Sequence, residues 1–162
     1  MRSSSSRPAW ATLRVRPSSI EPVFLLDTHI VSDLRRPERA SERLLAWSRE
    51  TPTHQQFISC ITVFELELGI RQKERRDHAP GRLLREWLED QVLPTFEGRI
   101  LDTGIAVARR CAAMMHVPNP APERDAWIAA TALVRGLTVV SRNTRDFAAC
   151  GAQVFNPWSA PV

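Results

Sequence analysis

The segment Val23-Phe24-Leu25-Leu26-Asp27 is the clearest indication of the fold, because a short apolar run ends there in a carboxylate. Four consecutive apolar residues are typical of a buried strand in a parallel sheet. Thr28, His29 and a helix-like segment follow at once, so Asp27 lies at the carboxyl end of the predicted strand. Ligands of α/β proteins bind at that edge of the sheet. The alternative is that Asp27 only caps the next helix.

Strands and helices alternate along the chain from Val23 onward. The segments that read as further strands are 56–60, 98–101, 137–141 and 153–155. The segments that read as helices are 30–34, a helix opened by Pro37, 63–76, 81–92 ending at Pro94, 105–115, and 125–136 with Gly136 as its C-terminal cap. Strands joined by helical crossovers predict an α/β domain of three layers, with helices on both faces of a mostly parallel sheet.

Apolar residues at spacings of three and four predict which faces of these helices are buried. In the helix opened by Pro37, the predicted face carries Ala40, Leu44 and Trp47. In the helix 105–115, the predicted face carries Ile105, Ala108, Ala112 and Met115.

The composition bounds the class of protein. A chain of 162 residues suffices for one domain with a sizeable core, and no apolar stretch approaches the length that spans a bilayer. Cys60, Cys111 and Cys150 are odd in number and widely spaced, so they predict neither a disulfide framework nor a zinc site. We expect a protein of the reducing cytoplasm, with no membrane association.

The positive charge is concentrated at the amino terminus. Residues 1–20 contain four arginines and no acid, and these four account for the excess of 22 basic over 18 acidic residues. We therefore expect residues 1–20 to be a disordered basic extension and residues 21–162 to form the domain. Any binding of nucleic acid by the domain must come from a local patch or a bound metal, because its overall charge is balanced.

Two further acids follow the pattern of Asp27. Glu65 comes shortly after the predicted strand 56–60, and it also completes a Thr-x-x-Glu capping box with Thr62, which is the structural alternative. Asp125 begins the helix 125–136 and lies in line with its apolar face, where a capping acid alone is not expected.

Asn143 and Asp146 lie in the predicted loop after Ser141, although each alone is also a common turn residue. In a parallel sheet the carboxyl ends of all strands share one edge, so these acids should gather there and repel one another unless a cation is bound. Oxygen ligands without a His/Cys cluster suit Mg²⁺ or Mn²⁺. A metal of this kind supports hydrolysis of phosphodiesters.

The chain resembles the PIN-domain ribonucleases, and among them the VapC-type toxins of bacterial toxin–antitoxin pairs. The segments that carry the resemblance are LLDTHIVSDLRRP (25–37), SCITVFELELGI (59–70), DAWIAATALVRGLTVVSRNTRDF (125–147) and FNPW (155–158). The resemblance implies a PIN-like α/β/α fold and a metal-dependent endoribonuclease, with RNA as substrate, a cognate antitoxin as partner, and a homodimer.

Carried over residue by residue, the resemblance assigns Asp27, Glu65 and Asp125 to a Mg²⁺ or Mn²⁺ site. The fourth acid of the family falls on Asn143, which can coordinate a metal but brings no charge. Asp146 either replaces that acid or only shapes the turn. His29 stands where the family usually has asparagine, and its imidazole is more simply a surface group or a neighbour of the ligands.

Other readings of the same residues are weaker. A phosphatase of the haloacid dehalogenase type needs a second aspartate two residues after the first, where this chain has His29. A phosphorylated receiver domain needs a lysine partner, and the only lysine, Lys73, is not suitably placed. The remaining alternative is a catalytically weak PIN-domain protein that still pairs with an antitoxin, because Asn143 replaces the fourth acid.

Overall fold

Five short strands form one parallel sheet in the order β3-β2-β1-β4-β5, in a computed structural model that describes residues 21–159. The strands are β1 (Phe24–Leu26), β2 (Gln56–Ser59), β3 (Ile100–Leu101), β4 (Thr138–Val140) and β5 (Val154–Phe155). Leu25 is paired with Phe57 of β2 on one side and with Val139 of β4 on the other. The predicted sheet is confirmed, and Asp27 follows its central strand.

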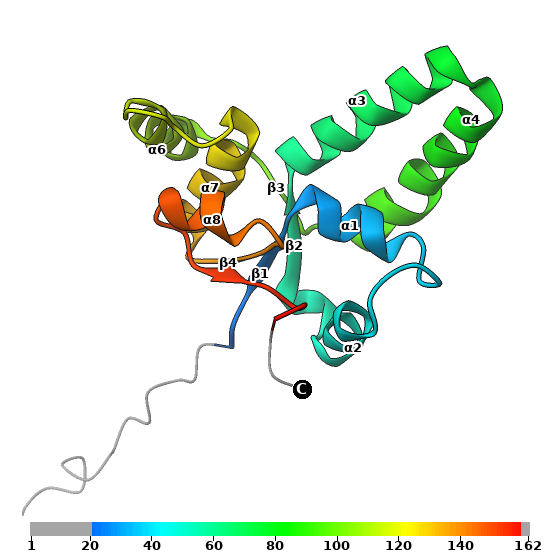
Figure 1. Cartoon of the computed structure of the whole chain (residues 1–162), viewed down its shortest axis with the longest axis horizontal. Coiled ribbons are helices and arrows are strands. Elements are labelled where there is room, and N and C mark those ends of the chain that lie inside the picture. Colours follow the sequence, from blue (N-terminus) through cyan, green and yellow to red (C-terminus); the bar gives the residue numbers. More distant parts are fainter. Residues whose placement is uncertain (1–20, 160–162) are drawn as a thin grey trace, which may run out of the picture.

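Helices cover both faces of the sheet (Figure 1). They are α1 (Thr28–Leu34), α2 (Glu42–Glu50), α3 (Cys60–Arg76), α4 (His78–Trp87), α5 (Leu93–Thr95), α6 (Ile105–Met115), α7 (Glu123–Arg135) and α8 (Thr144–Ala149), with a 3₁₀ turn η2 (Thr53–Gln55) and a π-helical turn η3 (Leu88–Val92). Helices α1 to α4 lie on one side of the sheet, and α6 to α8 lie on the other. None of the helices between residues 21 and 159 is long and apolar enough to cross a membrane.

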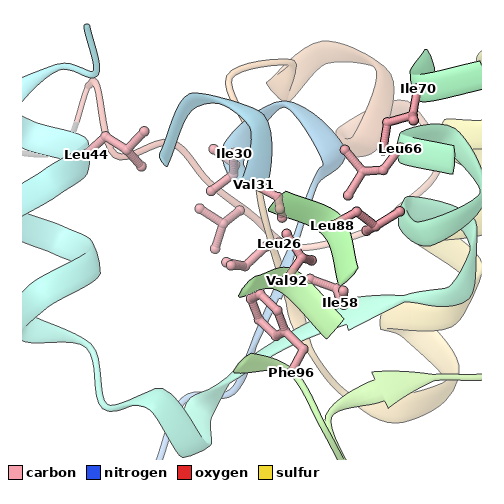
Figure 2. Close-up of a cluster of buried hydrophobic side chains, with 11 residues drawn as sticks. Leu26, Ile30, Val31, Leu44, Ile58, Leu66, Ile70, Leu88, Val92 and Phe96 are labelled. Carbon is pink, nitrogen blue, oxygen red and sulfur yellow. The ribbon is translucent and has the colours of Figure 1, made fainter. Parts of the chain in front are cut away.

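Alternate residues of β1 supply the two halves of the core, because successive side chains of a strand point to opposite faces. Leu26 packs with residues of α1, α2, α3 and η3, as Figure 2 shows. Leu25 packs with Ile128 and Ala129 of α7 and with Phe147 of α8. The apolar run quoted first is therefore buried on both faces, as predicted.

The second helix begins later than predicted. Pro37 lies in a turn, and α2 starts at Glu42, where the hydroxyl of Ser41 accepts a hydrogen bond from the backbone N–H of Leu44 at 3.1 Å. A serine that satisfies a free N–H fixes the start of a helix more strongly than a proline upstream of it.

The predicted face of helix 105–115 is only partly buried, because Met115 packs against the core while Ile105 and Ala112 are exposed. Ile105 is 81% exposed, whereas Val107 and Cys111 are buried against Ala126 and Ala130 of α7. The helix carries small apolar residues on several of its sides, so its sequence allows more than one buried face. The face that is buried is the one that packs against the small residues Ala126 and Ala130 of α7.

Two other boundaries differ from prediction. The helix expected to stop at Pro94 continues past it, because the π-helical turn η3 leads directly into α5, which contains Pro94. The loop expected after Ser141 contains the short helix α8. The predicted basic extension, residues 1–20, lies outside the described residues.

Candidate active site at the carboxyl edge of the sheet

Asp27 is buried at the junction of β1 and α1, with only 4% of its surface exposed. Its two carboxylate oxygens accept separate hydrogen bonds of 2.7 Å, one from the backbone N–H of Thr28 and one from the hydroxyl of Ser141. The first bond makes Asp27 the N-cap of α1, as the structural alternative predicted. The second comes from the end of β4, so the carboxylate also joins two strands at the edge of the sheet.

Glu65 lies on α3 and turns toward the same edge. Its Oε1 accepts a hydrogen bond of 2.8 Å from the Thr28 hydroxyl, and its Oε2 lies 3.5 Å from Nη1 of Arg124. The predicted capping box is wrong: Ser59 is the N-cap of α3 and accepts from the N–H of Thr62, which is buried inside the first turn. Glu65 therefore has no role at the helix end.

Asp125 lies in the first turn of α7 and is held from α8. The side-chain amide of Asn143 donates to Oδ2 of Asp125 at 3.0 Å and to Oδ2 of Asp146 at 2.8 Å. The N–H of Asn143 donates in turn to the Ser141 hydroxyl that binds Asp27. Asn143 thus links the aspartates as a donor, and the carboxylate that the resemblance expects at this position is replaced by an amide.

The electrostatics reflect how closely the acids are gathered. Burial, and then the neighbouring charges of Asp27, Asp146 and Glu65, raise the pKa of Asp125 to about 6. Burial also raises the pKa of Asp27, with Glu65 adding to the rise while the bonds from Ser141 and Thr28 oppose it. Like charges that raise one another's pKa in this way attract a cation.

The carboxylate oxygens are the type of ligand that a divalent cation prefers, but their side chains are not positioned around a common point. Between residues 21 and 159, no group of three or more His, Cys, Asp or Glu side chains is arranged to hold a metal ion. The carboxylates instead engage Thr28, Ser141, Asn143 and Arg124. Oxygen-only, negatively charged and partly desolvated ligands nonetheless fit Mg²⁺ or Mn²⁺ in chemistry.

Basic side chains border the acids. His29 is exposed and lines a depression with Asp33, Arg142 and Asn143 beside the site. Arg142 forms an ion pair of 2.8 Å with Asp33 and lies over the ring of Trp158, with 4.2 Å between its Cζ and the ring centroid. Arg142 therefore brings a positive charge to the depression that Asn143 also lines.

Three residues that shape the site were not identified from the sequence. Thr28 and Arg124 both contact Glu65, and Ser141 contacts Asp27. Thr28 and Ser141 each stand next to a strand end, which was the only available signal. Arg124 had no signal beyond its place before Asp125.

Comparisons with known proteins show the family of the chain and agree with its fold. Residues 24–152 match the family described as PIN domain. The chain is 38% identical to toxin FitB of Neisseria gonorrhoeae over 141 residues, which cover 84% of this chain and 99% of that protein. It is 33% identical to VapC ribonuclease Y4jK of Sinorhizobium fredii over 145 residues, covering 84% and 98% of the two chains. The crystal structure of FitAcB from N. gonorrhoeae superposes with a TM-score of 0.77 at 36% identity, covering 85% of this chain and 100% of that chain.

Proposed function

The chain belongs to the PIN-domain family, and on that premise we propose that it is a Mg²⁺- or Mn²⁺-dependent endoribonuclease that acts as the toxin of a toxin–antitoxin pair. The observation that carries the proposal is the meeting of Asp27, Glu65 and Asp125 at one edge of the sheet. They come from β1–α1, α3 and α7, far apart in the sequence. A helix-capping role leaves the gathering of all three unexplained.

In this proposal Asp27, Glu65 and Asp125 hold the divalent cation. A cation bound there supplies Lewis-acid polarisation of an RNA phosphodiester. Ser141 and Thr28 orient Asp27 and Glu65 through their hydroxyl groups, and Asn143 orients Asp125. Asp27 is almost fully buried, so its orientation is fixed by these bonds rather than by solvent.

The names of the relatives support the choice of substrate and partner. One is called a ribonuclease and another a toxin, so we propose RNA as the substrate and an antitoxin as the inhibitor. We assign the catalytic unit to residues 21–162. A homodimer, which the family resemblance implies, stays a prediction.

The test is cleavage of RNA by the purified protein with Mg²⁺ or Mn²⁺, compared with the same reaction in EDTA. We expect cleavage only with the metal. Absence of cleavage with either metal would favour the second candidate, a catalytically weak PIN-domain protein that pairs with an antitoxin, which the amide at Asn143 supports.

Glu65→Gln tests the site more directly. We expect it to reduce cleavage by about 100-fold or more, since loss of even an outer partner of a metal ligand costs about 10- to 100-fold. The fold should persist, because Ser59 caps α3 without Glu65. The matched control is Glu86→Gln, an exposed glutamate of α4 paired with Arg82. Full activity in a folded Glu65→Gln protein would remove Glu65 from the site.

A further inference from the structure

Phe64 is a large apolar side chain that stays 52% exposed beside the site. It lies on α3 immediately before Glu65. The other large apolar side chains exposed within residues 21–159 are Leu83, Ile105, Val117 and Val134, none of them aromatic. An exposed aromatic ring next to a site acid offers a flat apolar surface on which a planar group can stack.

Arg124 lies over this ring, with 5.4 Å between its Cζ and the ring centroid. Its Nη1 is also 3.5 Å from Oε2 of Glu65, and its side chain is half exposed. Within the described part of the chain, Arg124 is the one basic side chain in ion-pair distance of Asp27, Glu65 or Asp125. An exposed pair at this distance is weak, so Arg124 can exchange the carboxylate for another anion.

The surroundings identify the chemistry of that anion. The groove that contains Glu65 and Arg124 is also lined by His29, Arg35 and Lys73, together with apolar side chains such as Leu84 and Trp87. Phe64 does not line this groove itself, but its ring lies against Arg124, which does. An arginine offers a planar fork of donors that matches a phosphate. Aromatic rings combined with a basic groove bind single-stranded nucleic acid, because bases stack on the rings and the backbone follows the charges.

Resting on the proposed ribonuclease function, we infer that Phe64 and Arg124 form a nucleotide subsite beside the acids. An unpaired base of the RNA stacks on Phe64, and a phosphate next to the cleaved one binds Arg124. Because Arg124 contacts both the ring of Phe64 and the carboxylate of Glu65, the subsite places the RNA backbone beside the carboxylates. The subsite selects single-stranded RNA over a duplex, in which the bases are already stacked.

The test measures binding of a fluorescent, mixed-sequence, single-stranded RNA pool in the Asp27→Asn background, which prevents cleavage. Adding Phe64→Leu should weaken binding by about 5- to 100-fold, and adding Phe64→Trp should preserve it, because only the second change keeps a stacking face. A matched pool of abasic strands should bind equally well with and without the Phe64→Leu change. Leu83→Ala, at an exposed apolar residue of α4, is the control and should change nothing.

Arg124→Gln gives a second, independent measurement. It should weaken binding and lower the slope of log affinity against log salt by about 0.7, the contribution of one phosphate contact on a single strand. Arg82→Gln, an exposed arginine of α4, should leave the slope unchanged.

The outcomes separate this inference from the proposed function. If the unmodified protein neither binds nor cleaves RNA with Mg²⁺ or Mn²⁺, the proposed function fails. If it cleaves RNA but Phe64→Leu binds the pool as tightly as before, the subsite is wrong. A change in molecular mass for Phe64→Leu in light scattering would also overturn it, because Phe64 would then belong to a contact between two copies of the chain.

Discussion

Asp125 is the residue whose titration has the clearest consequence for stability. Its pKa rises from 3.8 in the unfolded chain to about 6 in the folded protein, first through burial and then through the neighbouring acids. Between these two values the folded state holds a proton that the unfolded state has lost, so stability falls as pH rises through this window. Above pH 6 the destabilisation is fully present.

Asp125→Asn should therefore stabilise the metal-free protein at pH 7.5 by about 1–2 kcal/mol, less than the whole shift implies because the side chain is partly exposed. The gain should disappear near pH 4. Urea unfolding in EDTA at both pH values measures it, with Asp90→Asn, at an exposed acid of η3, as the control. An equal effect at the two pH values would mean that charge at Asp125 is not responsible.

Asn143→Asp tests the amide that stands in place of a fourth acid. The change removes the hydrogen bonds donated to Asp125 and Asp146 and adds a like charge, so the metal-free protein should lose about 1–3 kcal/mol of stability. The same charge should lower the Mn²⁺ concentration for half-maximal cleavage several-fold. Asp146→Asn should raise that concentration only if Asp146 serves as a ligand. Unchanged metal titrations for both variants would limit the site to Asp27, Glu65 and Asp125.

Candidate site residues could be predicted from the sequence only where they follow a predicted strand or interrupt the apolar face of a predicted helix. Asp27 and Asn143 follow apolar runs, and Asp125 interrupts an apolar helix face, so local pattern was enough to name them as candidates. Ser141 and Asp27 are 114 positions apart in the sequence, and their contact depends on the pairing of β1 with β4. No local pattern contains that register, so the partners of the acids could not be predicted.

Among the elements, α3 and α4 pack closely against each other because Gly81 of α4 has no side chain at their contact. A Cβ on Gly81 would lie 2.6 Å from Cα of Glu74 on the facing helix, closer than packed atoms allow. Gly81→Ala should push the helices apart and destabilise the protein by about 1–3 kcal/mol. Gly69→Ala is the matched comparison, because Gly69 is an exposed helical glycine with open space around it.

Gly69→Ala should stabilise α3 by up to about 1 kcal/mol, because alanine loses less backbone entropy in a helix. Thermal unfolding of both variants checks the pair. Equal effects would indicate that helix propensity, and not the approach of α4 to α3, decides the outcome at Gly81.

Element boundaries were predictable where one residue type determines them. Gly136 ends α7 in the left-handed conformation, with φ of 71°, as its sequence position predicted. The start of α3 was misplaced because both Ser59 and Thr62 can cap a helix, and the hydrogen bond from the N–H of Thr62 to the Ser59 hydroxyl shows that Ser59 is the cap. The face of α6 was misplaced because its partner, α7, is a tertiary contact.

At the scale of the whole molecule, the parallel sheet explains why local signals gave the correct architecture. All strands run in one direction, so every strand ends at the same edge, and acids that follow strands must meet there. This inference requires the order of strands and helices along the chain, but it does not require the distances between their side chains. It therefore predicts that a site exists without predicting which hydrogen bonds hold it.

The gathering of acids at one edge has a cost for the entire fold, which a bound cation should relieve. We expect Mn²⁺ to raise the melting temperature of the wild-type protein, since a ligand at 100 times its Kd stabilises the folded state by about 2.7 kcal/mol. Asp27→Asn should remove most of this rise, because Asp27 is the most buried of the proposed ligands. Asp90→Asn should retain it. Sodium chloride at equal ionic strength separates binding from general screening, which relieves exposed charges but reaches buried ones poorly. A wild-type protein that gains no more from Mn²⁺ than from sodium, or an Asp27→Asn protein that gains as much as wild type, would contradict a metal site at this edge.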